Sequence, residues 1–181
     1  MSEAPDIARE TERLDALYRA KARAEIEAAE ALVSGSVVRG QGDPLALVLL
    51  VKGTPGAEDR AAGRALAGAD GVAIGRALDA LGLPEERFAF CSHVGRQAKA
   101  RISRTRLMTE AVDPRVVVLL DAEAAADFAA AFGVPVPPFG EVVRVLGREV
   151  LAVDGFEASL GDESAKRRVW KQLKALERAE D

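Results

Sequence analysis

Three short and almost entirely apolar runs limit how this chain can fold. They are LALVLLVK (Leu45 to Lys52), RFAFCS (Arg87 to Ser92) and RVVVLL (Arg115 to Leu120). Apolar runs of this length without polar alternation are typical of strands that are covered on both faces, as in a parallel sheet. Because segments with helical spacing of apolar residues follow these runs, the sequence predicts an α/β fold.

The segments between and around the strands have the pattern of helices. The N-terminal one is rich in Ala, Glu, Arg and Leu and has no glycine or proline in its interior. Asp121 stands where a helix would begin, and its carboxylate can accept hydrogen bonds from the first free amides. Helices are expected at about Pro5 to Val33, Ala69 to Leu81, Gln97 to Val112, Asp121 to Phe132 and Asp162 to Ala179, and two short strands within Glu141 to Val153.

The length of 181 residues suits one domain with an appendage. We expect residues 34–181 to form a single three-layer α/β/α domain with a central, mainly parallel sheet. Residues 1–33 are expected to form an N-terminal helix that either docks along a narrow stripe or offers a face to a partner protein.

The counts of cysteine and histidine exclude several kinds of site. One cysteine, Cys91, and one histidine, His93, cannot form an internal disulfide, a Cys-ligated iron–sulfur cluster or the usual Cys/His zinc site within one chain. We therefore expect no metal and no cofactor. The formal net charge of −4 does not indicate a general nucleic-acid binder, although a local basic patch can bind under an acidic average.

No apolar leader is visible at the N-terminus, and the longest apolar run, Leu45 to Val51, is too short to span a bilayer. The sequence thus favours a cytoplasmic protein that does not enter a membrane. The abundance of Ala, Arg and Gly suggests a bacterial source with a GC-rich genome.

Two strand ends hold the local candidates for chemistry. Lys52 to Gly56 (KGTPG) is a turn that either faces a ligand or DNA or serves folding alone, and Glu58, Asp59 and Arg60 follow in a loop that suits solvent. At the second strand end, Cys91 and His93 share a face, but their Cβ atoms would lie about 6–7 Å apart, too far for a direct dyad. We therefore expect His93 to be an exposed or hydrogen-bonded residue at the end of a strand.

Two basic segments are the candidates for binding an anionic partner. The first contains five cations and no acid, and it suits nucleic acid, an acidic protein or plain solvation. The second is a basic stripe on the last helix, where Trp170 is expected to pack against the sheet. The five cations are Arg96, Lys99, Arg101, Arg104 and Arg106, and the stripe is Lys166, Arg167, Arg168, Lys171 and Lys174.

Four segments, in order, resemble the uracil-DNA glycosylase superfamily, and most of all its small iron–sulfur branch from bacteria and archaea. Val37 to Gly68 resembles the entry segment of that branch, with its Glu-Ala-Pro-Gly loop and Gly-Arg-Pro-Phe-Val-Gly motif. Ile74 to Val94 resembles the helix and strand that end in Thr-Asn-Val. Asp113 to Gly133 resembles the Pro-Lys-Val-Ile-Val-Ala-Leu-Gly unit, and Ala158 to Leu176 resembles the stretch after His-Pro-Ser. The resemblance implies a glycosylase-like fold.

The catalytic positions of that family are changed in this chain. The loop acid that places the attacking water would fall at Gly53, and the Phe that stacks on the flipped base at Leu66. The Asn that reads uracil would fall at His93, and the catalytic His at Gly155. The cysteines that bind the cluster are absent. The resemblance therefore implies a fold that has kept its core and lost its site.

Three functional hypotheses follow. The first is a catalytically degenerate glycosylase-like protein that binds nucleic acid, or acts as an adaptor, in DNA repair or replication. The second is an active glycosylase with relocated groups, for which the candidate residues are Asp59, Glu157 and His93. The third is a protein-interaction subunit whose partner, such as a repair or replication protein, binds the N-terminal helix. The sequence favours a protein that is not an enzyme.

Overall fold

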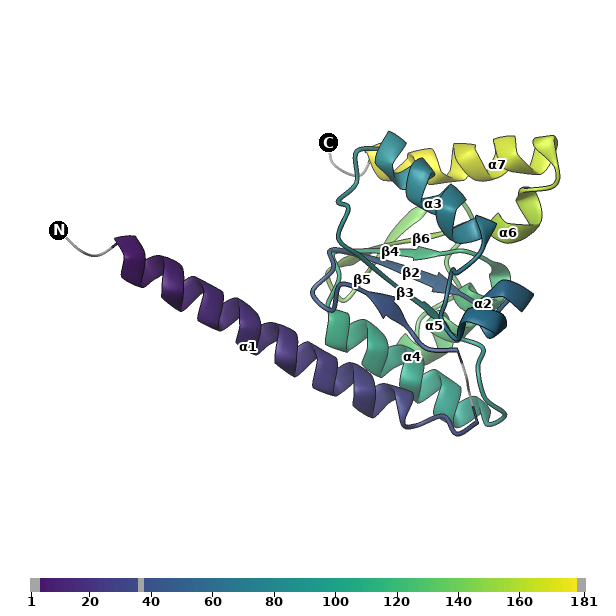
Figure 1. Ribbon diagram of the computed structural model, residues 1–181. Helices are drawn as coiled ribbons and strands as arrows, with labels where there is room; N and C mark the ends of the chain where they lie inside the picture. Colours follow the sequence, from purple (N-terminus) through teal and green to yellow (C-terminus); the bar gives the residue numbers. More distant parts are fainter. Residues whose placement is uncertain (1–3, 36–37, 179–181) are drawn as a thin grey trace.

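A six-stranded sheet forms the centre of the molecule in the computed structural model, which describes residues 4–35 and 38–178 (Figure 1). The strand order is β1-β3-β2-β4-β6-β5. The four inner strands are parallel, and each edge strand pairs in the antiparallel sense. The strands are β1 (Gln41–Gly42), β2 (Val48–Lys52), β3 (Arg87–Cys91), β4 (Val116–Leu119), β5 (Val142–Val145) and β6 (Arg148–Ala152).

The central strands are buried on both faces, as the apolar runs predict. Every residue of β2 and β4 is buried. Leu50 of β2 is in register with Ala89 on one side and Val118 on the other. Leu49 and Leu50 belong to two different core clusters, one on each face of the sheet. The α/β class and the mainly parallel sheet are thus confirmed.

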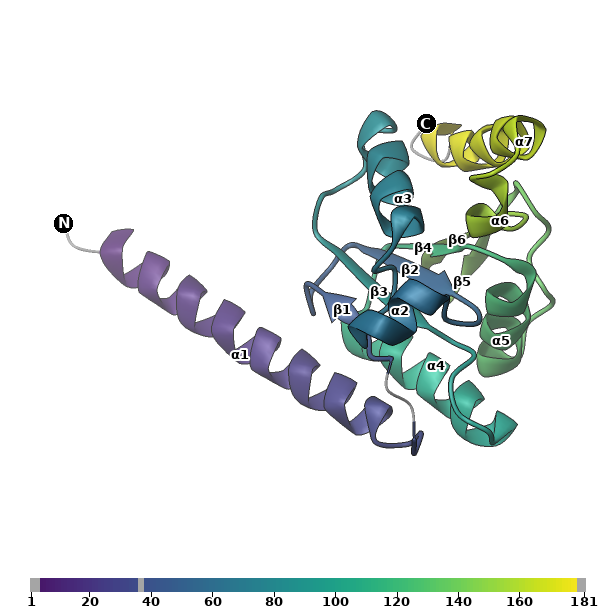
Figure 2. The same cartoon turned by 45° about the vertical axis from the view of Figure 1, so that its right-hand side comes forward.

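Helices cover both faces of this sheet (Figures 1 and 2). One face packs against α3, α6 and α7, and the other against α4, α5 and the end of α1. Residues of β2 and β4 contribute to the cores on both sides. The helices are α1 (Ala4–Glu30), α2 (Ala57–Ala62), α3 (Ala69–Ala80), α4 (Ala98–Val112), α5 (Ala122–Phe132), α6 (Phe156–Ser159) and α7 (Glu163–Leu173), and α7 continues into a 3₁₀ helix, η1 (Lys174–Arg178).

The N-terminal helix docks only through its C-terminal half. Ala22, Ile26 and Ala29 are buried and α1 packs on α4, whereas the first half of the helix projects away from the sheet (Figure 2). Four large apolar side chains on that half are exposed: Ile7, Leu14, Leu17 and Tyr18. The expected docking of the N-terminal helix along a narrow stripe is therefore limited to the C-terminal half of α1.

Two short helices lie where the sequence predicts loops, and the last helix is shorter than expected. The Gly-rich stretch after β2 contains α2, and α6 precedes the last helix. The final residue of the expected helix, Ala179, lies outside the described residues. Within the described ranges, no helix is long and apolar enough to cross a membrane.

Candidate functional site

The carboxyl ends of the parallel strands form the edge at which α/β proteins place their sites. The chain leaves β2 toward α3 on one face and leaves the adjacent strand β4 toward α5 on the other. The loops that begin at Gly53, Ser92, Leu120 and Val153 therefore meet at this edge. All four pocket positions that the resemblance singles out lie in or near these loops, and we take this edge as the candidate site.

A buried lysine holds the centre of the edge. The Nζ atom of Lys52 lies 2.7 Å from a carboxylate oxygen of Asp59, 2.7 Å from one of Asp70 and 2.9 Å from one of Glu157. The side chain of Lys52 is only 4% exposed and that of Asp59 only 1%, whereas Glu157 is open to solvent. We call these four residues the Lys52 cluster. It ties together β2, α2, α3 and α6.

Lys52 and Asp59 both favour their charged forms. Burial opposes the charge on Lys52, but the hydrogen bonds to Asp59, Asp70 and Glu157 outweigh it and raise the pKa of the ammonium above its ordinary value. Burial likewise opposes the charge on Asp59, but hydrogen bonds from Lys52 and from the amides of Ala67 and Gly56 hold the pKa of this carboxyl below its ordinary value.

The structure gives Asp59 a structural role. Its two oxygens accept three hydrogen bonds, from Lys52 Nζ, from the amide of Gly56 at 2.8 Å and from the amide of Ala67 at 2.9 Å. A carboxylate with these partners holds the start of α2 and the following loop in place. Glu157, the second candidate acid, keeps an exposed carboxylate and binds Lys52.

Gly53 has no room for the acid that the glycosylase family would place there. A Cβ atom at this position would lie 2.6 Å from Oδ1 of Asp121 and 2.7 Å from Oε2 of Glu123. The amide of Gly53 donates to Asp121, which also caps the first turn of α5 through Ala124. Two carboxylates from α5 thus already occupy the space in front of Gly53.

The other three pocket positions differ in their surroundings. Leu66 is buried, lies in the core cluster next to α3 and has a left-handed backbone with φ of 52°. Gly155 also has a positive φ, 70°, and a Cβ atom there would make only an ordinary contact with the Cβ of Ala158, at 3.8 Å. His93 lies beside Gly53, because its amide donates to the carbonyl of Gly53. The structure thus brings Gly53 and His93 together and buries Leu66 in the core.

His93 belongs to a second polar group at this edge. Its Nδ1 atom lies 3.3 Å from Oδ2 of Asp127 and 3.5 Å from Oε1 of Glu123, both on α5. Ser92 is fully buried, and its hydroxyl donates to the same oxygen of Asp127 at 2.9 Å. Serine and histidine thus share one acceptor instead of bonding to each other, so they do not form a nucleophile–base relay. A fifth member, Thr54, donates to Glu123.

Cys91 is not available as a nucleophile. Its side chain is fully buried, and burial raises the pKa of the thiol to about 12. A thiol with this pKa is protonated at neutral pH and unreactive. The burial of Cys91 agrees with the strand geometry, which also argues against a Cys91–His93 dyad.

The basic run before and along α4 is not one exposed surface. Arg104 is fully buried, donates to the carbonyl of Cys91 at 2.7 Å and pairs with Glu30 of α1. Arg106 pairs with Glu110, and Arg101 donates to the carbonyls of the loop before α4. Of the five cations, Arg96 and Lys99 are exposed and form no ion pair with any residue in 4–35 or 38–178. Arg104 therefore joins two helices and is not available to a phosphate.

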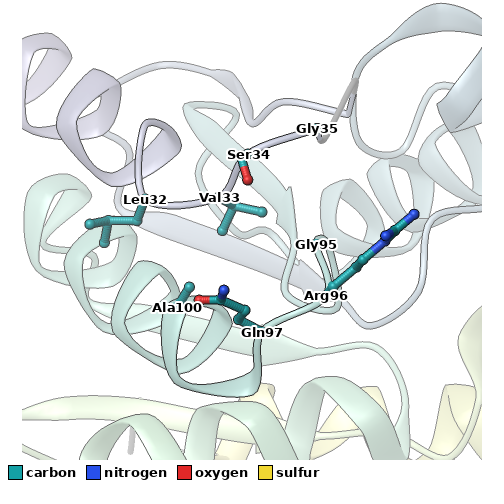
Figure 3. A pocket seen from close by; sticks show the side chains of 8 residues that line it. All are labelled: Leu32, Val33, Ser34, Gly35, Gly95, Arg96, Gln97 and Ala100. Carbon is teal, nitrogen blue, oxygen red and sulfur yellow. The ribbon is translucent and has the colours of Figure 1, made fainter.

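A cavity of about 420 Å³ lies beside this loop, between the end of α1 and the start of α4 (Figure 3). Backbone and small side chains form much of its wall, and the side chain of Arg96 extends away from Leu32 and Gln97. The residues that line it are Leu32, Val33, Ser34, Gly35, Gly95, Arg96, Gln97 and Ala100. This cavity is separate from the Lys52 cluster.

Sequence reasoning placed Lys52 in a candidate turn without foreseeing its ion pairs, and it missed Asp70, Glu123 and Asp127 as members of the site. One signal was present: Lys52 is a charged residue that ends an apolar run, and such a lysine needs buried acids near it. Within residues 4–35 and 38–178, no group of three His, Cys, Asp or Glu side chains is arranged to hold a metal ion.

Comparison with models of protein families gives no match to this chain, and comparison with curated proteins gives none either.

Proposed function

We propose that this chain is a glycosylase-like protein that has lost base excision and that works as a nucleic-acid-binding or adaptor protein in DNA repair or replication. The observation that supports the loss of excision most directly is the Lys52 cluster. At the edge where an excision site would bind the flipped base, the ammonium of Lys52 and the buried carboxylates of Asp59 and Asp70 are bonded to one another.

Excision of uracil places specific demands on a site. A carboxylate or amide must position water, a hydrogen-bond donor must stabilise the uracil anion, and a flat side chain must stack on the flipped base. Here the position of the water-placing acid is Gly53, with two carboxylates of α5 in front of it. The stacking position is Leu66, which is buried in the core. Loss of one such group typically slows catalysis about a hundredfold or more.

The exposed cations next to this edge support the binding half of the proposal. Arg96 and Lys99 flank the start of α4, where the first helical turn has no acidic residue. Cations in such a place can neutralise backbone phosphates, and this contribution weakens as salt increases.

The test is uracil release from single-stranded and double-stranded oligonucleotides, run beside an active glycosylase as a control. We expect no release above the background rate. Enzyme-dependent release would refute the loss of catalysis and support relocated groups. Since His93 is the partly exposed imidazole oriented by Asp127, the variant His93→Ala should then abolish the activity. DNA binding is measured separately at several salt concentrations, and absence of binding at low salt would refute the nucleic-acid half.

A second candidate is a protein-interaction subunit, and the exposed apolar side chains on the first half of α1 favour it. Removal of residues 1–33 would also remove Glu30, the partner of the buried Arg104, and so disturb the fold. Removal of residues 1–18 leaves that contact intact. A partner that co-purifies with the full chain and not with this shorter form would support the candidate; equal recovery with both forms would refute it.

A further inference from the structure

The outward face of α7 differs from the rest of the surface. Arg167, Trp170, Lys171 and Lys174 stand at positions i, i+3, i+4 and i+7, so they share one side of the helix. All four are exposed. We call these residues the α7 basic face. The opposite side of the helix packs into the core through Val169, Leu173 and Leu176.

The cations of this face have no acidic partner. On either side of it, Lys166 pairs with Glu163 and Arg168 pairs with Asp154. Within the described part of the chain, Arg167, Lys171 and Lys174 form no ion pair. The segment 163–178 contains six basic and two acidic residues, although the whole chain has a net charge of −4. Unpaired cations concentrated on one helix of an acidic protein indicate an anionic ligand.

Trp170 is the second observation, and it is independent of the charges. It is the only tryptophan of the chain, it is 37% exposed, and it belongs to neither core cluster. Trp170 is therefore not part of the core, and a substantial part of its ring faces solvent. Arg167 and Lys174 lie one turn before and one turn after it, so an aromatic surface stands between cations.

We propose that the α7 basic face binds single-stranded nucleic acid, with backbone phosphates on Arg167, Lys171 and Lys174 and a base stacked on Trp170. This inference rests on the proposed function. It assigns the main contact with nucleic acid to α7 instead of the start of α4. The three cations span about 10 Å along the helix, at 1.5 Å per residue, which matches a few successive phosphates of one strand. Stacking on an aromatic side chain together with cations is the usual mode of binding to single strands.

The same features argue against two other anionic partners. Trp170 is the only large apolar side chain exposed on the described part of α7, and a membrane-bound helix needs a wider apolar face. An intact duplex hides the faces of its bases, so it would use the cations and leave Trp170 without a stacking partner.

The experiment titrates the full chain with oligothymidylate while two signals are recorded. Anisotropy of a labelled oligonucleotide reports binding, and fluorescence excited beyond the absorption of Tyr18 reports Trp170 alone, since the chain has one tryptophan. We expect quenching that follows the anisotropy and a slope of log K against log salt near −2, about −0.7 for each of three phosphates. Replacement of Arg167, Lys171 and Lys174 by Ala should bring this slope close to zero. Trp170→Ala should weaken binding at least about fivefold.

The control removes three equally exposed cations elsewhere, Arg9, Arg13 and Arg76, and so causes the same change in net charge. This control variant should bind within about twofold of the parent. Binding that survives the α7 substitutions, leaves Trp170 fluorescence unchanged and disappears with Arg96→Ala and Lys99→Ala would overturn this inference and leave the proposed function standing. Equal binding to polyglutamate or to anionic vesicles would also overturn it, as would absence of any binding, which refutes both nucleic-acid proposals.

Discussion

Replacement of Lys52 by Met tests whether the Lys52 cluster is the structural centre of the edge. Methionine keeps the length and apolar stem of the side chain and removes the ammonium. Asp59 and Asp70 then remain buried without their shared cation, at 1% and 4% exposure. Breaking a buried ion pair by removing one partner typically costs about 3–5 kcal/mol. A protein of this size would lose about 6–20 °C in Tm.

The assay is chemical unfolding followed by far-ultraviolet circular dichroism at pH 7. Lys166→Met is the matched control, because it removes an exposed lysine whose partner Glu163 is also exposed, and it should change the stability by less than about 1 kcal/mol. The combined variant Lys52→Met, Asp59→Asn, Asp70→Asn removes the charges together and should recover part of the loss, since the side chain at position 59 can then accept from only one of the amides of Gly56 and Ala67. A folded Lys52→Met protein that loses less than about 1 kcal/mol would refute the assignment of a buried, obligatory ion pair.

The same variant predicts a specific dependence on pH. The pKa of Asp59 is lower in the folded protein than in the unfolded chain, so its contribution is complete above the unfolded value of about 3.9 and is lost as the pH falls through the folded value. The pKa of Lys52 is raised, so its contribution is complete below the unfolded value of about 10.4. The stability difference between the parent and Lys52→Met should therefore be constant from about pH 5 to 9 and should shrink in acid.

Two further predictions concern single residues. Arg104→Met should destabilise the protein by about 3 kcal/mol, because it leaves Glu30 without its buried cation. Arg106→Met, at an exposed pair, should cost less than about 1 kcal/mol. Both free energies of unfolding are measured with urea, and equal effects would contradict the burial of Arg104. Leu146→Asn should stabilise the protein by about 1 kcal/mol, since Leu146 is 69% exposed and has φ of 48° in the turn between β5 and β6; a lower Tm would contradict this.

The strands were predictable because their burial is recorded in single, uninterrupted apolar runs. Their order was not, because apolar side chains on both faces of β2, β3 and β4 suit any neighbour in a parallel sheet. The helix α2 was missed for a related reason. Its six residues follow several glycines, and it depends on Asp59, which in turn depends on Lys52 from another element. Such a helix is specified by tertiary contacts that local sequence patterns do not reveal.

A run of basic residues in the sequence does not reveal which of its side chains are exposed and which are buried. The run from Arg96 to Arg106 reads as one patch, yet Arg104 stands four and seven residues before the buried Met108 and Ala111, on the inner side of α4. Helical spacing could have separated Arg104 from its neighbours. It could not have identified Glu30 as its partner, because the two residues are 74 positions apart in the sequence.

Polar groups at the sheet edge are already bonded to one another within the fold, and this favours function through surface contacts. A catalytic group must change its partners during the reaction, so it needs a lone pair or a proton that the folded state does not already engage. Asp59 is engaged by an ammonium and two amides, and Asp121 by two amides. Ser92 is engaged by Asp127. In the described residues, exposed cations without an ion-pair partner stand instead on helices such as α7 and in the loop before α4, where a ligand can reach them without disturbing the fold.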